Sequence, residues 1–409
     1  MTIGIRDYAL VTGAYWGFTL TDGALRMLVL LHFHDLGFSP FDIALLFLFY
    51  EFFGVVTNLV GGWIASRLGL KVTLFSGLAL QVLALSALAH FDPGWVEWAG
   101  VAYVMAAQAL SGIAKDLTKM SSKSAVKTLV PDEQHGALFK WVAVLTGSKN
   151  ALKGVGFFLG GVLLGAFGFR GALLAMAGGL VVVLALSVLM LPTDIGRAKV
   201  KVKFTQILSK SRDVNVLSAA RFFLFGSRDI WFVVGLPLFL AAQLGWSHAE
   251  VGAYMAGWVI AYGFIQAIAP RVLGKGRNAP GGAVSRMWIL ALLGVTGAIA
   301  WAVAAEYHPG LVVVAGLAAF GFVFAVNSAV HSYLILAYTH ADHVALNVGF
   351  YYMANAAGRL AGTVLSGWAY QWGGMSACLW TSAAFVAAAW AASLALPPGR
   401  AQSAYDERH

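Results

Sequence analysis

Long apolar runs recur along the whole chain and constrain its fold more than any other feature. The runs are about 20–25 residues long, enough for an α-helix to cross a hydrocarbon core of roughly 30 Å. Only 11% of the 409 residues are charged, too few to cover a soluble surface of this size. The runs lack the period-two alternation of a β-barrel, and abundant glycine and alanine suit closely packed helices. The sequence therefore predicts an all-α polytopic membrane protein.

The apolar runs and the loops between them also predict the topology. We expect twelve transmembrane helices, at residues 8–33, 41–66, 72–90, 97–122, 137–164, 171–191, 217–242, 250–270, 285–305, 311–338, 345–370 and 376–396. The longest loop is basic and separates two six-helix bundles, so we expect an N-terminal bundle (1–191), a cytoplasmic linker (192–216) and a C-terminal bundle with a short cytoplasmic tail (217–409). Lysine and arginine gather in alternate loops, which places both termini in the cytoplasm.

The two predicted bundles resemble each other in sequence. Residues 36–39 (Leu-Gly-Phe-Ser) match residues 244–247 (Leu-Gly-Trp-Ser), and the segment from Asn150 to Lys153 resembles the one from Asn355 to Arg359. Two similar halves around a central site are typical of secondary transporters. We expect the two halves to rock around a site lined by spans 1, 4, 5, 7 and 11.

Basic residues at membrane depth are the main functional signal. Four lysines recur every four residues at the end of span 4: Lys115, Lys119, Lys123 and Lys127. This spacing puts them on one helix face; we expect the first two to meet substrate and the last two to lie at the membrane interface. Lys149 and Lys153 repeat the spacing in span 5. Charges at this depth are costly and usually face a bundle interior or a water-filled path, so the substrate should be an anion.

Spans 1 and 7 each combine an arginine with an aspartate. Asp22 and Arg26 are four residues apart, so they either neutralise each other or leave Arg26 facing a cavity. Arg228 and Asp229 are adjacent, so we expect them to point about 100° apart and not to face one partner. The planar fork of an arginine can bind phosphate-like oxygens at two points.

Other polar residues within the spans complete the candidate set. Glu51 is either a proton-coupling group or a structural partner of a buried lysine, and His331 either titrates or packs. The predicted substrate-binding residues are Arg26, Lys115, Lys119, Lys149, Lys153, Arg228, Arg359, His331 and Asn355. The predicted coupling or charge-pairing residues are Asp22, Glu51, Asp116 and Asp229.

Several classes of protein fit the sequence poorly. The net charge of +9 lies largely in loops that set topology, so we expect no nucleic-acid partner. The single cysteine, Cys378, excludes a disulfide framework and a multi-thiolate metal site. We find no nucleophile–base or metal motif, and expect no cofactor and no enzymatic activity. A receptor or scaffold would leave the mid-membrane lysines without a purpose. We expect a monomer in the lipid bilayer.

Two family resemblances refine these expectations. Residues 62–71 resemble the loop 2–3 signature of the major facilitator superfamily, although Ser66 stands where that family usually has aspartate. Residues 15–27, 50–58, 108–119 and 145–153 resemble organoarsenical efflux permeases of the ArsJ type. That resemblance implies a bacterial inner-membrane exporter of 1-arseno-3-phosphoglycerate that confers arsenate resistance. This ester forms when glyceraldehyde-3-phosphate dehydrogenase accepts arsenate in place of phosphate.

The residues are compatible with such a substrate on chemical grounds. Both ends of the ester are oxyanions, so two cationic clusters are sensible binding groups. Trivalent arsenic would instead favour several soft thiolates, which Cys378 alone does not provide. An exporter or exchanger of ordinary phosphorylated metabolites or other organic anions stays open as an alternative, and so do uniport and proton antiport.

Overall fold

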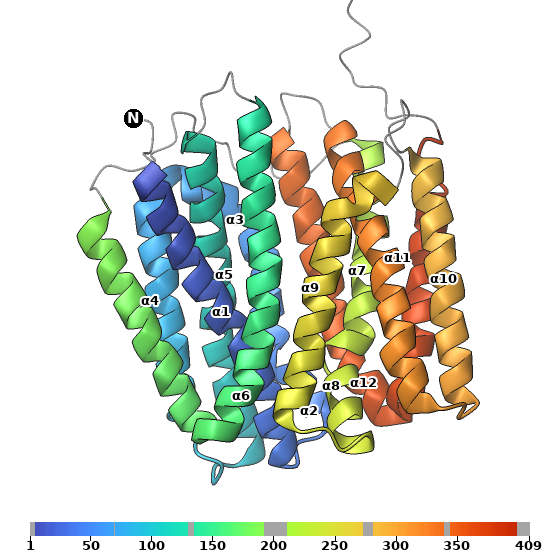
Figure 1. The fold of residues 1–409 in the computed structure, drawn as a ribbon, viewed down its shortest axis with the longest axis horizontal. Coiled ribbons are helices and arrows are strands. Elements are labelled where there is room, and N and C mark those ends of the chain that lie inside the picture. Colours follow the sequence, from blue (N-terminus) through green and yellow to red (C-terminus); the bar gives the residue numbers. More distant parts are fainter. Residues whose placement is uncertain are drawn as a thin grey trace, which may run out of the picture. The chain divides into compact units, whose positions relative to one another are not determined.

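The computed structural model describes residues 5–68, 70–129, 135–191, 211–272, 281–338 and 344–398, which form helices and turns only (Figure 1). Most of the predicted linker (192–210) and the end of the C-terminal tail (399–409) lie outside the described residues. The helices are α1 (Ile5–Asp35), α2 (Pro40–Leu46), α3 (Leu48–Leu68), α4 (Leu70–Leu88), α5 (Glu97–Leu129), α6 (His135–Met190), α7 (Arg212–Phe232), α8 (Gly235–Leu238), the π-helix η2 (Phe239–Gln243), α9 (His248–Val272), α10 (Gly282–Ala304), α11 (Pro309–Ala337) and α12 (Val344–Ser393).

Every one of the twelve predicted spans overlaps a helical segment of the structure. Two long helices each contain two predicted spans, and glycines with non-helical backbone angles separate the two spans in each helix. Gly168 (φ 65°) breaks α6, and Gly373 with Gly374 (φ 61°) breaks α12. Within the described residues, eight helical stretches are long and apolar enough to cross a membrane. The predicted all-α polytopic fold is confirmed.

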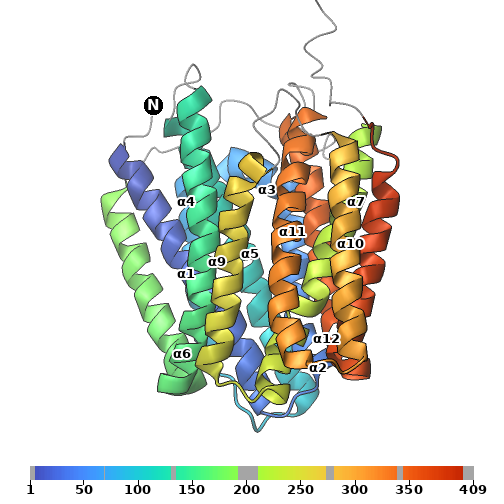
Figure 2. The same ribbon diagram turned by 45° about the vertical axis from the view of Figure 1, so that its right-hand side comes forward.

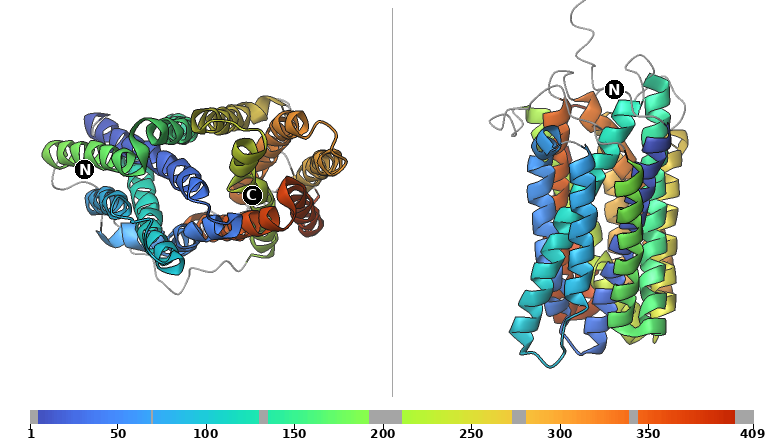
Figure 3. Two further views of the ribbon diagram at one scale, coloured as in Figure 1. Left: turned by 90° about the horizontal axis from the view of Figure 1, so that it is seen from below. Right: turned by 90° about the vertical axis from the view of Figure 1, so that its left-hand side faces the viewer.

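The chain divides into two compact units. Unit 1 comprises Met1–Phe38, Leu45–Phe204 and Trp246–Ile260, and unit 2 comprises Ser39–Ala44, Thr205–Gly245 and Ala261–His409. The helices within each unit run side by side along their length, as the end-on view in Figure 3 illustrates. The bundle boundaries expected from the sequence stay a prediction.

In unit 1, α1 packs along α6 through small residues. A side chain on Gly156 or Gly160 would collide with the backbone of α1, and one on Gly23 would collide with the Lys153 carbonyl oxygen. These glycines let the two backbones touch, which fixes the depth at which the charged residues of α1 and α6 lie.

In unit 2, α7 packs along α12 in a similar way. A side chain on Gly358 would overlap the Phe222 carbonyl oxygen, and one on Gly362 would collide with Gly226. The α10 and α11 helices run beside each other in the same unit (Figures 1 and 2).

The helical path breaks at Val233 and Val234, between α7 and α8, three residues before Pro237, which lacks a backbone N–H. The Ser366 hydroxyl, on α12, accepts hydrogen bonds from the backbone N–H groups of Val234 and Gly235, both at 3.1 Å. Amides at the break therefore find a partner although they lie in the protein interior.

The sequence match between residues 36–39 and 244–247 has a structural counterpart. Gly37 (φ 84°) and Gly245 (φ 67°) both adopt the left-handed conformation that favours glycine. Two residues later a serine caps the next helix: the Ser39 Oγ accepts from the backbone N–H of Asp42, and the Ser247 Oγ from that of Glu250. The two chain reversals are therefore built from the same parts.

Candidate functional site

The predicted site residues of unit 1 lie on four helices: α1, α3, α5 and α6. Arg26, on α1, donates from Nη2 to the Glu51 Oε1 on α3 at 2.5 Å, and both side chains are buried. Of the two interpretations that the sequence left open for Glu51, this contact favours a structural partner of a buried cation. The partner is an arginine, where the sequence had pointed to a lysine.

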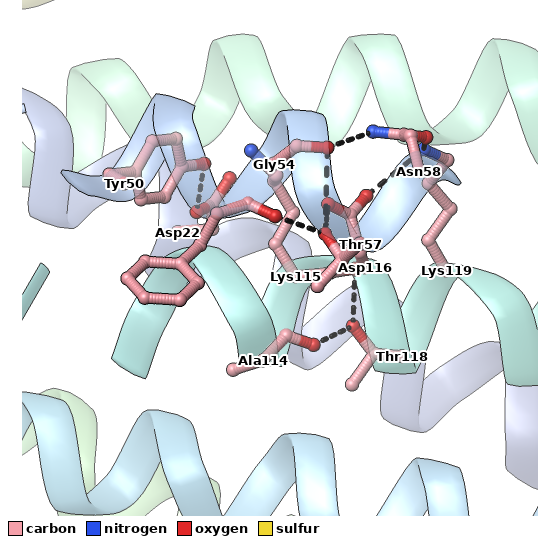
Figure 4. Close-up of polar contacts among 11 residues, drawn as sticks. Asp22, Tyr50, Gly54, Thr57, Asn58, Ala114, Lys115, Asp116, Thr118 and Lys119 are labelled. Carbon is pink, nitrogen blue, oxygen red and sulfur yellow. Dashed lines mark hydrogen bonds and ion pairs between the residues drawn. The ribbon is translucent and has the colours of Figure 1, made fainter. Parts of the chain in front are cut away.

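Tyr50, on α3, connects charged groups of two other helices, α1 and α5. Its hydroxyl donates to the Asp22 Oδ1 at 2.6 Å (Figure 4). The Arg26 guanidinium lies 5.1 Å from the centre of its ring, and the Lys115 Nζ lies 3.9 Å from it. The ring of Tyr50 thus contacts two cations, while its hydroxyl holds a carboxylate.

Asp116 is the centre of a second network, between α3 and α5 (Figure 4). Its carboxylate accepts from the Thr57 hydroxyl at 2.5 Å and from the Lys119 Nζ at 3.0 Å, and its side chain is fully buried. Lys119 also donates to the Asn58 Oδ1 at 2.7 Å. Asp116 therefore partly neutralises Lys119, and the Lys119 side chain keeps 19% of its surface exposed.

The two lysines of α6 follow α1 along the glycine-rich contact. Lys149 and Lys153 are both half-buried, and the Lys153 Nζ lies 5.7 Å from the centre of the Phe157 ring. The backbone carbonyl of Lys153 faces Gly23, one residue from Asp22. In unit 1, the predicted site residues therefore comprise five cations and three carboxylates.

In unit 2, Asp229 binds two arginines. Its Oδ1 accepts from the Nε of Arg228 at 2.6 Å, and its Oδ2 accepts from the Nε of Arg359 at 3.1 Å. The expectation that Arg228 and Asp229 point apart is wrong. The long, flexible stem of arginine lets its head turn back to a neighbour, although the Cα–Cβ bonds of adjacent residues diverge on a helix.

A buried arginine that the sequence analysis did not single out lies two helical turns before Arg228. The Arg221 side chain donates from Nε to the Asn355 Oδ1 at 2.9 Å and from Nη1 to the Ser328 carbonyl oxygen at 3.4 Å. Its guanidinium lies 3.7 Å from the centre of the Phe225 ring and 5.1 Å from that of Tyr351. The seven-residue spacing places Arg221 and Arg228 on one face of the helix. This spacing is the feature of the sequence from which Arg221 could have been predicted as a site residue.

His331 and Asn355 take different positions around Arg221. Asn355 holds the guanidinium directly. His331 is fully buried on α11, its Nε2 lies 3.0 Å from the Ser285 hydroxyl, and its Nδ1 has no partner among the described residues. The hydrogen bond to Ser285 is consistent with the packing role that the sequence left open.

Parts of the sequence-based argument fall on residues whose side chains the structure does not describe. Lys123 and Lys127 belong to α5, and Ser66 to α3, but their side chains lie outside the described residues. Lys71, at the end of the 62–71 segment, donates to the Leu191 carbonyl oxygen at 3.0 Å. This contact joins the start of α4 to the end of α6 within unit 1.

The sequence profile described as Major Facilitator Superfamily matches residues 11–329. The chain belongs to the Major Facilitator Superfamily. Comparison of the sequence with curated proteins finds no significant match.

Solved structures of superfamily transporters share the fold. A POT family transporter in complex with 5-aminolevulinic acid superposes with a TM-score of 0.71 at 14% identity, covering 94% of each chain. A D-xylose-proton symporter superposes with a TM-score of 0.68 at 15% identity, covering 97% of this chain and 98% of the other. At sequence identities this low, the superpositions show a shared fold and nothing about the substrate. As a superfamily member with apolar membrane-spanning helices, the chain is a membrane transporter of small solutes rather than an enzyme.

Proposed function

We propose that this transporter exports an organic anion with two oxyanion ends, specifically the arsenate ester 1-arseno-3-phosphoglycerate, by alternating access. The observation that supports an anionic substrate is the excess of cations over carboxylates among the polar residues of the helices. In unit 1, the carboxylates of Glu51 and Asp116 accept from Arg26 and Lys119. In unit 2, the carboxylate of Asp229 forms ion pairs with both Arg228 and Arg359, and Arg221 adds a third cation.

The chemistry of these groups supports recognition of oxygen. Guanidinium and ammonium groups bind phosphate and arsenate oxygens through charge-assisted hydrogen bonds. The lone Cys378 is buried and would not supply the thiolates that trivalent arsenic prefers. The choice of the arsenate ester rests on the resemblance of residues 15–27, 50–58, 108–119 and 145–153 to the organoarsenical efflux permeases.

The rest of the physiological proposal follows from that substrate. Glyceraldehyde-3-phosphate dehydrogenase would produce the ester inside a bacterial cell, and its removal through the inner membrane would confer arsenate resistance. The lysines and arginines of the alternate loops would place both termini in the cytoplasm. Moving one charge through 100 mV is worth about 2.3 kcal/mol, so a polyanion leaves an inside-negative cell downhill and uniport suffices energetically.

Single substitutions test the cations of each unit separately. We expect Arg26→Ala and Lys153→Ala each to lower uptake of the arsenate ester into everted membrane vesicles by about tenfold or more, because each removes a charge-assisted contact. Arg359→Ala should lower uptake as well, because it breaks the ion pair with Asp229 that joins α12 to α7. Arg212→Ala, which changes an exposed residue at the start of α7, is the matched control. Normal uptake by the Arg26 and Lys153 variants would refute the assignment of these two cations to the substrate.

An exporter of ordinary phosphorylated metabolites is the second candidate, because oxyanion-binding cations do not distinguish arsenic from phosphorus. Competition between the arsenate ester and unmodified 3-phosphoglycerate separates the two functions. Our proposal predicts that 3-phosphoglycerate binds the same cations more weakly, so that it inhibits uptake only at concentrations well above that of the ester. Equal competition would favour the phosphate-ester exporter.

A further inference from the structure

We propose that Arg221 is the oxyanion-binding arginine of unit 2, and that the Arg228–Asp229–Arg359 cluster chiefly holds α7 against α12. This inference rests on the proposed transport of an organic anion and names the group in unit 2 that contacts the anion. Arg221 was not among the residues that the sequence pointed to.

The charge balance around the three arginines differs sharply. Arg228 and Arg359 share the carboxylate of Asp229, whose side chain is 1% exposed. Arg221 is 4% exposed, and no carboxylate of a described residue forms an ion pair with it. A buried cation without a counter-ion is costly and is usually retained for a functional reason. An anionic ligand at Arg221 would supply the missing charge.

The guanidinium of Arg221 is also held in a fixed orientation. Its Nε donates to Asn355, on α12, and its Nη1 to the carbonyl oxygen of Ser328, on α11. The ring of Phe225, one turn further along α7, lies 3.7 Å from it. Because three helices position the group before any ligand binds, little conformational entropy would be lost on binding.

One nitrogen of Arg221 remains available for a ligand. Nη2 forms no hydrogen bond with a described residue. It is also not one of the fully buried polar atoms of the described residues that lack a partner, so part of its surface is accessible. A phosphate or arsenate group at this edge could accept from Nη2 and from Nη1, whose bond to Ser328 is long at 3.4 Å. The fork geometry favours a tetrahedral oxyanion and explains the choice of arginine over lysine.

Polar groups next to Arg221 extend the site. The Ser328 hydroxyl accepts from the Tyr262 hydroxyl at 3.1 Å and from the Gln266 Nε2 at 3.3 Å, both on α9. These neutral groups introduce no carboxylate that would repel an anion. They can adjust their hydrogen bonds when a ligand arrives, since hydroxyl groups both donate and accept.

The test compares four variants of the purified full-length protein in detergent: Arg221→Lys, Arg221→Gln, Arg359→Gln and the control Arg212→Gln. Binding of 3-phosphoglycerate and of inorganic arsenate is measured by isothermal titration, and the unfolding temperature is measured without ligand. We expect Arg221→Lys to weaken 3-phosphoglycerate binding by about tenfold or more, Arg221→Gln to weaken it further, and Arg212→Gln to leave it unchanged.

The unfolding temperature separates a ligand-binding arginine from a structural one. Arg221→Gln removes a cation that has no carboxylate partner, so ligand-free protein should unfold at the same temperature or higher. Arg359→Gln breaks the contact with Asp229 and should lower the unfolding temperature.

Four outcomes decide between the two proposals. Wild-type affinity for 3-phosphoglycerate in both Arg221 variants would overturn the inference, as would a large fall in the unfolding temperature of Arg221→Gln. If Arg221 variants lose binding but wild-type vesicles do not move the arsenate ester, the Arg221 site stands and the proposed substrate fails. If the wild-type protein binds no oxyanion, both fail.

Discussion

At the scale of single residues, the structure separates cations that have carboxylate partners from cations that do not. Arg26 lies against Glu51, and Lys119 against Asp116. Arg221 is held by an amide, a carbonyl group and aromatic rings instead. A substrate oxyanion can bind Arg26 or Lys119 by replacing the carboxylate that pairs with it. Arg221 can bind an oxyanion without losing a carboxylate partner.

Asp229 is the residue whose loss should cost unit 2 the most stability. Asp229→Asn leaves two arginines without their shared carboxylate, and breaking a buried ion pair from one side costs about 3–5 kcal/mol. We expect a clear fall in the unfolding temperature of the detergent-purified protein. Glu97→Gln, at an exposed position in the first turn of α5, should change stability by no more than about 0.5 kcal/mol. Equal unfolding temperatures for both variants would contradict the role of Asp229.

Tyr50 allows the contribution of a ring to be separated from that of a hydroxyl. Tyr50→Phe keeps the ring beside Lys115 and Arg26 but removes the hydrogen bond to Asp22, a net loss of about 0.5–1.5 kcal/mol. Tyr50→Leu removes both. We expect a modest rise in the KM for uptake with phenylalanine and a larger rise with leucine. A larger effect for phenylalanine than for leucine would show that the ring does not position the cations.

At the scale of helices, the contacts between α1 and α6 and between α7 and α12 decide where charged side chains lie. Arg359 and Gly358 are neighbours on α12, and Lys153 and Gly156 lie within one turn of each other on α6. Close backbone contact therefore holds the cations at a fixed depth along α1 and α7. The repeated segments around Lys153 and Arg359 belong to these equivalent helix pairs.

Gly358→Ala tests the contact between α7 and α12. The added methyl group would overlap the Phe222 carbonyl oxygen, so the helices must separate, at a cost of about 1–3 kcal/mol. We expect a lower unfolding temperature and slower transport. Gly294→Ala, on α10, is the matched control, because a side chain there meets no atom within 4 Å; it should leave stability unchanged or slightly raised. If the two variants behaved alike, close α7–α12 contact would not be required.

Some of these features could be predicted from the sequence, and others could not. The spans were predictable because apolar length follows directly from membrane thickness. The short breaks that separate two spans within α6 and within α12 were not, since they depend on the backbone angles of Gly168, Gly373 and Gly374. The partners of the charges were also out of reach: helical spacing gives the direction of a Cβ, but the Arg228 head group turns back to Asp229.

At the scale of the whole molecule, the surplus of cations predicts a transport step that responds to membrane potential. In everted vesicles, an imposed lumen-positive potential should accelerate uptake of the arsenate ester without a pH gradient, because each negative charge gains about 2.3 kcal/mol per 100 mV. Potassium gradients with valinomycin set the potential, and strong buffers at the same pH on both sides of the membrane keep the pH gradient at zero. Uptake that requires an acidic lumen would instead indicate proton antiport.

The most direct measurement of the central claim is the movement of the arsenate ester itself. Everted vesicles with and without the transporter are placed in a medium where glyceraldehyde-3-phosphate dehydrogenase makes the ester from glyceraldehyde 3-phosphate, arsenate and NAD. Arsenic in the lumen is then quantified against samples that lack the dehydrogenase. We predict accumulation that needs both the transporter and the enzyme and that falls in the Arg26→Ala variant. Equal arsenic in vesicles with and without the transporter would contradict the account.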